Sequence, residues 1–213
     1  MNVVIKKKDE TDISYDQIVK LMHDAFEERL QQGLNFKCSF MTVDEFKRNT
    51  QNSTILVAIN EESNEFLGFG VVSVRKGRIR GKYAFVQDLS VSPKVKRCGI
   101  GSKLERMSEC VAQNSGCKYM ECTTAVDAES SVKYHLKQGY KIVGLESFPT
   151  TNYYSYIFRK YLQPSIWQNG FFCKLVYAIL CIKTYLSKRK NGSRTILGYI
   201  FDLPSFVQKR CRL

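Results

Sequence analysis

The sequence predicts an α/β (α+β) fold whose elements follow the order β-α-α-β-β-β-α-β-α-β-β. Three observations support this prediction. Short β-branched apolar runs alternate with segments of helical periodicity, two helices begin at capping boxes, and a glycine turn joins a strand to a helix. With 213 residues, the chain is long enough for one domain and an appendage.

The first elements are a strand over residues 3–7 and two capped helices. Ser14-Tyr-Asp-Gln17 and Thr42-Val-Asp-Glu45 have the spacing of capping boxes, in which two side chains satisfy free backbone N–H groups at a helix start. We expect the first helix to end near Gly33 and the second near Arg48. The apolar side of the first helix consists of Ile18, Leu21, Met22, Ala25 and Phe26.

Three strands are predicted next, over residues 54–60, 66–74 and 83–91, with a basic turn over residues 75–82 between the last two. In the third strand, strict alternation places Gln87 and Leu89 on one side and Asp88 and Ser90 on the other.

The second half is predicted to contain two helices and three strands. The helix after Gly99 has an apolar stripe of Ile100, Leu104, Met107 and Val111. A strand over residues 119–126 follows. Asp127 is expected to cap the next helix, which runs to Gly139, and strands over residues 141–145 and 153–161 complete the domain.

The glycine turn, Lys96-Arg-Cys-Gly99-Ile-Gly101, is the most informative motif. Glycines let a backbone approach a ligand closely, and the N-terminus of the following helix presents N–H groups at the positive end of the helix dipole. Lys94, Lys96 and Arg97 add positive charge. The turn therefore predicts an anion site, most simply one for a phosphate.

Composition favours a cytoplasmic globular protein without a metal site. The eight cysteines are scattered without a Cys-x-x-Cys pair, and His23 and His135 are the only histidines. We therefore expect reduced thiols and no metal. The first residues contain no long apolar run, so we expect no signal peptide.

The C-terminal segment, residues 163–213, differs from the rest of the chain. It holds nine of the 33 basic residues but only one acid, Asp202, within an overall net charge of +13. Residues 171–182 are almost wholly apolar but too short to span a bilayer. Two roles remain open: a peripheral anchor on an anionic membrane, or a helical extension packed on the domain or in a homodimer, which we favour.

Residues 3–162, with the motif Lys96-Arg-Cys-Gly99-Ile-Gly101 between a strand and an amphipathic helix and a helix ending at Gly139-Tyr140 downstream, resemble the GNAT N-acetyltransferases. The family motif is Arg/Gln-x-x-Gly-x-Gly/Ala, and lysine here replaces its first residue. The resemblance implies a mixed, mostly antiparallel central sheet with helices on both faces. It also implies acetyl-CoA as the acyl donor and a GNAT domain over residues 1–162, followed by the extension.

The resemblance further implies which residues contact the coenzyme and where the acyl group lies. The strand before the turn parts from residues 121–124, and the Leu89 N–H is expected to polarise the acetyl carbonyl. The expected coenzyme contacts are Leu89, Ser90, Val91, Lys96, Arg97, Cys98, Gly99, Ile100, Gly101, Ser102, Thr124 and Ser131.

Two side chains are candidates for proton transfer. His135 stands where many relatives carry a tyrosine, four residues before Gly139, so we expect it to donate a proton to the CoA thiolate or to hydrogen-bond its sulfur. Asp88 is the candidate base, but with an ordinary pKa of about 4 it needs burial to raise that value. The alternative, that Asp88 only holds water or substrate, stays open.

The acceptor is less sharply specified. Gln87-Asp-Leu-Ser-Val91 is most similar to amino-sugar acetyltransferases, which favours an amino sugar or a nucleotide-linked amino sugar, with a protein or peptide amine as the alternative. A non-catalytic basic module that binds CoA or nucleic acid is a second class, which the glycine turn and His135 disfavour; nucleic acid is thus not the expected partner. Acceptor contacts are predicted at Phe26, Glu27, Arg29, Phe36, Gln87 and Tyr153 to Tyr156.

Overall fold

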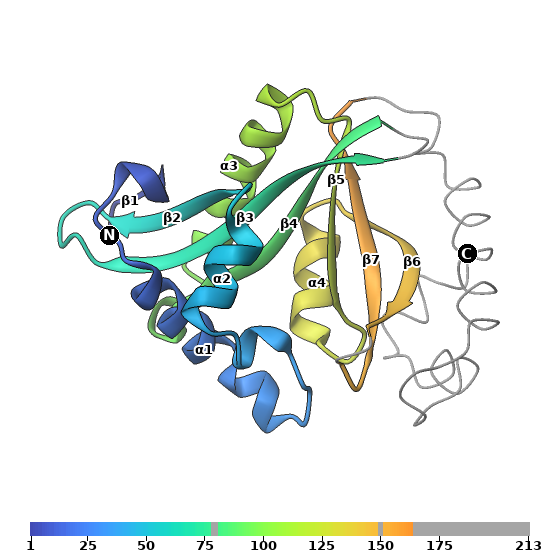
Figure 1. Ribbon diagram of the computed structural model, residues 1–213, viewed down its shortest axis with the longest axis horizontal. Coiled ribbons are helices and arrows are strands. Elements are labelled where there is room, and N and C mark those ends of the chain that lie inside the picture. Colours follow the sequence, from blue (N-terminus) through green and yellow to red (C-terminus); the bar gives the residue numbers. More distant parts are fainter. Residues whose placement is uncertain (78–80, 149–150, 164–213) are drawn as a thin grey trace. The chain divides into compact units, whose positions relative to one another are not determined.

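The computed structural model describes residues 1–77, 81–148 and 151–163 (Figure 1). The chain divides into two compact units, Met1–Glu121 and Cys122–Leu213. The basic segment over residues 164–213, including its apolar run, lies outside the described residues, and so do residues 78–80 and 149–150.

The predicted order of strands and helices is confirmed, and three short 3-10 helices are added. The first unit contains β1 (Val3–Lys7), η1 (Lys8–Glu10), α1 (Tyr15–Gln31), η2 (Lys37–Ser39), α2 (Val43–Thr50), β2 (Thr54–Asn60), β3 (Phe66–Gly77), β4 (Gly81–Val91), η3 (Pro93–Val95) and α3 (Ile100–Asn114). Strand β5 (Tyr119–Ala125) crosses the boundary. The second unit continues with α4 (Glu129–Lys137), β6 (Lys141–Ser147) and β7 (Tyr154–Tyr161).

The sheet of the first unit has the strand order β1-β2-β3-β4-β5. The pairs β1–β2, β2–β3 and β3–β4 are antiparallel, whereas β5 runs parallel to β4. The parallel ladder pairs residues 83–85 with residues 119–121, whereas β4 continues to Val91. The C-terminal end of β4, residues 86–91, therefore lies beyond its pairing with β5.

Helices cover both faces of this sheet: α1 and α2 lie in front of it in Figure 1, and α3 lies behind. Both predicted capping boxes are present, with Ser14 Oγ and Thr42 Oγ1 each accepting from the backbone N–H three residues later at 3.2 Å. Such caps contribute about 1 kcal/mol each. The core beneath α1 and α2 includes Ile18, Met22, Phe46, Val57, Phe69 and Val71, all 0% exposed.

Two predictions in the first unit need correction. The buried face of α3 consists of Ile100, Leu104, Glu105, Ser108 and Ala112, while Met107 and Val111 are only half-buried. A polar Ser108 fits this face because its hydroxyl donates to the Leu104 carbonyl at 2.9 Å. The expected basic turn over residues 75–82 is also shorter, because β3 runs on to Gly77 and β4 begins at Gly81. Lys76 then stands directly opposite Lys82.

The second unit has the strand order β5-β7-β6, with β6 and β7 antiparallel. Val132 on α4 and Tyr156 and Phe158 on β7 are fully buried. The N-cap residue is Ala128, one residue later than the expected Asp127, and it makes no side-chain cap bond. Ala128 N–H donates to the Ala125 carbonyl and Glu129 N–H to the Asp127 carbonyl, at 3.0 and 2.9 Å. The helix ends at Lys137, two residues earlier than expected.

Candidate active site

A β-bulge interrupts β4 where the acyl-handling residues were predicted. Gln87 pairs with Val71 and Ser90 pairs with Phe69, so Asp88 and Leu89 together face the single residue Gly70. Asp88 adopts a left-handed backbone with a φ of 56°. The strict alternation predicted for this strand therefore fails at Asp88, since a bulge re-aims the side chains that follow it.

Two glycines in β3 make room for the bulge. A Cβ atom on Gly68 would lie 2.7 Å from the Ser90 carbonyl oxygen, and one on Gly70 would lie 3.1 Å from Leu89 Cδ1. The first of these contacts is with backbone, which cannot move away easily. The bulge in β4 is thus accommodated by small residues on the neighbouring strand.

The Asp88 carboxylate contacts a thiol from a distant part of the first unit. Cys38 Sγ, in η2, donates to Asp88 Oδ1 at 3.0 Å. Burial raises the pKa of Asp88, while the Cys38 hydrogen bond and the charge of Lys37 oppose that rise. Burial, together with the Asp88 charge, also holds the Cys38 pKa well above its usual range. Asp88 therefore ionises closer to neutral pH than an exposed aspartate does.

The glycine turn, residues 96–101, leads into α3 through residues with left-handed backbone. Arg97 and Gly99 have φ values of 67° and 78°, and Gly99 is the N-cap of α3 without a side-chain cap bond. A Cβ atom on Gly99 would meet nothing within 4 Å, so the space before the helix is open. The first turn of α3 carries no acidic residue. This uncapped, positively charged helix start fits the diphosphate of a coenzyme A molecule.

A lysine of this turn is tied to α1. Lys96 Nζ lies 2.7 Å from Glu28 Oε2. The hydrogen bond and charge of Lys96 lower the pKa of Glu28. Both side chains are about half exposed (45% and 57%), so this ion pair contributes little to stability. The ion pair nevertheless connects α1, which carries three of the predicted acceptor contacts, to the glycine turn.

In the second unit, the predicted His135 contacts a cysteine on β5. Cys122 Sγ lies 3.5 Å from His135 Nδ1, and the rings of Tyr134, Tyr140 and Phe158 have centroids 5.0–5.5 Å from the imidazole. This apolar enclosure lowers the pKa of His135 to about 4. The imidazole is therefore neutral at pH 7, where one of its nitrogens carries an N–H group.

The other predicted contacts are distributed over both units. Phe26 packs against Phe36 with centroids 5.3 Å apart, Glu27 is exposed, and Arg29 donates to Gln32 Oε1 at 3.1 Å. Gln87 is half-buried. In the second unit, Thr124 is buried on β5, Ser131 is half-buried on α4, and Tyr153 to Tyr156 are all buried. Packing therefore accounts for those tyrosines better than acceptor binding does.

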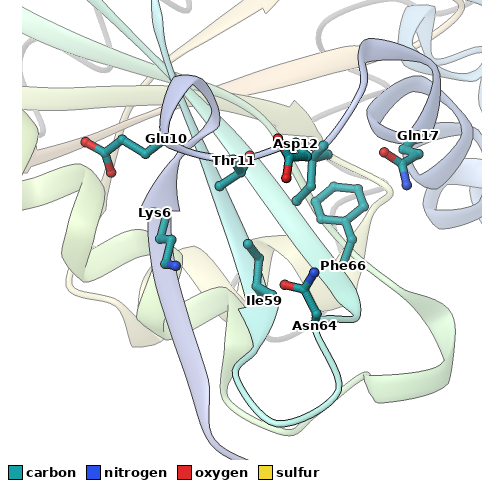
Figure 2. A pocket seen from close by; sticks show the side chains of 9 residues that line it. Lys6, Glu10, Thr11, Asp12, Gln17, Ile59, Asn64 and Phe66 are labelled. Carbon is teal, nitrogen blue, oxygen red and sulfur yellow. The ribbon is translucent and has the colours of Figure 1, made fainter.

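A separate cavity of about 270 Å³ lies where β1, η1 and the start of α1 meet the β2–β3 turn (Figure 2). Its nine lining residues include Lys6, Asp12 and Asn64, and none of them was predicted to belong to the site. Glu10 and Gln17, which also line it, accept from the backbone N–H groups of Lys7 and Ser14. Two of the polar side chains that line the cavity are thus already hydrogen-bonded at the N-termini of η1 and α1.

Three contacts of the candidate site residues were not predicted. Cys38 contacts Asp88 and Glu28 contacts Lys96 in the first unit, and Cys122 contacts His135 in the second. The partners are 50, 68 and 13 residues apart in sequence. No local spacing rule joins residues so far apart. The Gly68-x-Gly70 pair is the one signal that could have indicated the bulge opposite it.

Comparison with solved structures shows the same fold in acetyltransferases. The NatC complex bound to Gag peptide and CoA matches with a TM-score of 0.60 and 15% identity, over 76% of this chain and 100% of that one. An aminoglycoside 6′-acetyltransferase type Ii matches with 0.58 and 18%, over 76% and 99%. An IAA acetyltransferase from Bacillus cereus matches with 0.53 and 18%, over 75% and 99%. No curated protein sequence matches this chain.

The mixed sheet and the uncapped glycine turn define an acyltransferase that uses a coenzyme A thioester. The profile of the acetyltransferase (GNAT) family matches residues 15–140, more than half of the chain, and this protein belongs to that family. The predicted family, enzyme class and acetyl-CoA donor are thereby confirmed. Among the described helices, none is both long and apolar enough to cross a membrane.

Proposed function

We propose that this enzyme acetylates the primary amine of a small acceptor, with Asp88 as the base that takes a proton from the acceptor's ammonium group, so that the free amine can attack the thioester carbon and displace the CoA thiolate. The observation that carries the proposal is the Asp88 carboxylate in the β4 bulge, which among the described residues has no cationic partner within ion-pair distance. A protonated amine would supply the missing positive charge. Burial raises the pKa of Asp88, which brings the carboxylate closer to the range useful for a base near neutrality.

The chain's own groups then have separable tasks. The N-terminus of α3, with Arg97 and Gly99 left-handed, would hold the coenzyme's diphosphate through backbone N–H groups. Acetyl-CoA supplies the acetyl group as a thioester. Leu89, which has no partner in the described β3–β4 register, offers its N–H to an acyl oxygen.

His135 is proposed to hydrogen-bond a sulfur rather than to protonate it. Its pKa of about 4 leaves the ring neutral across the working range, and one ring nitrogen already lies 3.5 Å from Cys122 Sγ. A neutral N–H group can stabilise a departing thiolate without transferring a proton. Of the two roles expected for His135, we therefore propose the hydrogen bond to the sulfur rather than proton donation.

For the acceptor class, we favour an amino sugar or a nucleotide-linked amino sugar, on the resemblance of residues 87–91 to amino-sugar acetyltransferases. A peptide amine is the second candidate. It is favoured by two large apolar side chains, Leu30 at the end of α1 and Phe40 directly after η2, which are 40% and 58% exposed. These residues flank in sequence the segment whose Cys38 contacts Asp88, and they offer exposed apolar surface to a peptide side chain.

The test measures CoA thiol release from acetyl-CoA by the full-length protein over a panel of a nucleotide-linked amino sugar, an aminoglycoside and peptides with free N-termini. We expect turnover with one sugar amine and its loss in Asp88→Asn, with acetyl-CoA binding retained by calorimetry. Turnover with peptides alone would select the second candidate. Full activity of Asp88→Asn would refute Asp88 as the base.

A further inference from the structure

The Cys38–Asp88 contact joins two segments that are separate in sequence. Cys38 lies in η2, between α1 and α2, and its sulfur is 3.0 Å from Asp88 Oδ1. Among the described residues, this thiol is the one hydrogen-bond donor to the Asp88 side chain. The carboxylate therefore depends on a single, rather weak donor for its orientation.

The backbone at Asp88 makes such an orienting contact useful. A left-handed φ of 56° is uncommon for a residue other than glycine, and the residue opposite, Gly70, has no side chain to pack against the carboxylate. The β4 chain thus presents Asp88 on a bulge where neither its own strand nor β3 fixes the side chain. The thiol from η2 is what holds it.

Few other titratable groups act on this carboxylate. Lys37 of η2 contributes a charge, and β3 places the non-titrating Gly70 and Val71 opposite the bulge. On α1, which also packs against β4, His23 Nε2 lies 3.0 Å from the Met41 carbonyl oxygen and Glu28 pairs with Lys96. A substitution at position 38 should therefore change the pKa of Asp88, with little contribution from other titratable groups.

We propose that Cys38 is a positioning residue. Its thiol holds the Asp88 carboxylate in the orientation in which the carboxylate takes a proton from the ammonium group of the substrate amine. The inference rests on the proposed role of Asp88 as base, and it assigns the Cys38 thiol a task that does not involve nucleophilic attack. Its reactivity fits this task, because burial and the neighbouring carboxylate keep the thiol protonated, and a protonated thiol is a donor rather than a nucleophile.

The first experiment compares Cys38→Ser, which keeps a donor, with Cys38→Val, which keeps an apolar side chain without one. The kcat/KM of the full-length enzyme is measured against pH. Loss of the donor should raise the Asp88 pKa, so the acidic limb of the Cys38→Val profile should move up by about half to one pH unit. Cys38→Ser should keep the limb close to that of the parent enzyme. Superimposable limbs in all three proteins would overturn the proposal.

The second experiment needs no turnover. Alkylation of Cys38 by iodoacetamide is followed at pH 9–10 by peptide mass spectrometry in the parent and in Asp88→Asn, with Cys98, which is exposed, as the internal control. Removing the carboxylate should accelerate modification of Cys38 several-fold and leave Cys98 unchanged. Equal rates at Cys38 would overturn the contact itself.

The two experiments separate the possible failures. If Asp88→Asn keeps full activity but Cys38 alkylation accelerates, the contact exists and the base assignment is wrong. If Asp88→Asn is inactive but the Cys38→Val profile does not move, Asp88 acts without help from Cys38. A folded Cys38→Ser protein, verified by its melting temperature, keeps the comparison valid even if Cys38→Val is unstable.

Discussion

The two units each enclose a titratable side chain next to a cysteine thiol, with opposite consequences. Asp88 in the first unit lies 3.0 Å from Cys38, and His135 in the second lies 3.5 Å from Cys122. Burial disfavours the charged form of both, so it raises the pKa of Asp88 and lowers that of His135 to about 4. The same physical effect thus moves the pKa of Asp88 toward neutral pH and the pKa of His135 away from it.

The largest expected effect is on turnover by Asp88→Asn. An amide has almost the same shape but cannot take a proton, so kcat/KM should fall by at least about 100-fold. Steady-state kinetics with saturating acetyl-CoA would measure this fall, with Asp127→Asn as a matched carboxylate control.

At neutral pH, Asp88→Asn should also be more stable than the parent protein. In the parent, the raised pKa of Asp88 means that the free energy of unfolding falls as pH rises above about 4.

The contrast with His135 can be sharpened through stability rather than rate. Its folded pKa of about 4 lies below the ordinary value of 6.5, so the unfolded chain takes up a proton first as pH falls. The free energy of unfolding should therefore decline between about pH 6.5 and 4, by about 1–3 kcal/mol. Urea melts should show a flatter pH dependence in His135→Gln.

For the same reason, the kcat of His135→Gln should fall without a new pH-dependent limb between pH 6 and 9. A limb near pH 7 that disappears in this variant would show that the histidine titrates in the working range. The comparison drawn between the two units would then fail.

The bulge that presents Asp88 can be tested with its two glycines. Gly68→Ala would place a methyl group 2.7 Å from a backbone oxygen, whereas Gly70→Ala meets the tip of Leu89 at 3.1 Å. We expect Gly68→Ala to destabilise by about 1–3 kcal/mol and Gly70→Ala by less, because a leucine side chain can rotate. Chemical denaturation of both variants would measure the difference. Equal losses would mean that the two strands are less tightly apposed than described.

The smallest effect is expected for Glu28→Gln. The exposed ion pair with Lys96 is worth at most about 1 kcal/mol, so the KM for acetyl-CoA should change less than about five-fold. The direction is informative: removal of the competing carboxylate should leave Lys96 more available to an anion and lower the KM. A rise in KM would indicate that the pair positions the turn instead.

Local rules predicted much of the fold from sequence. The capping boxes at Ser14 and Thr42 formed as expected, since each depends on residues three positions apart. The glycine turn could also be predicted, because it depends on neighbouring residues and its Gly99 is the N-cap of the helix that follows. The N-cap of α4 was predicted one residue too early, because the helix begins after Ala128 and the Asp127 backbone carbonyl accepts from Glu129 N–H.

The surroundings of the candidate site residues were harder to predict from the sequence. His135 could be selected by its register to Gly139, but its pKa depends on the rings of Phe158 on β7 and of Tyr140, three residues after α4, and no spacing rule reports that enclosure. The bulge at Asp88 breaks the period of two on which the strand was predicted. Cys38 could not be found at all, because its partner is 50 residues away and a lone cysteine in a loop has no pattern.

The far end of the β3–β4 hairpin has a consequence for solubility. In the described ladder, β2 pairs with β3 only as far as Val72, so Val74 (42% exposed) and its neighbours lie along an open strand margin. Exposed Arg75 and Lys76 occupy this margin, and Lys76 faces Lys82 across the ribbon. A second copy of this chain that added its own β3 margin there would bring its Arg75 and Lys76 next to these side chains. Repulsion between like charges therefore disfavours edge-to-edge pairing at this margin.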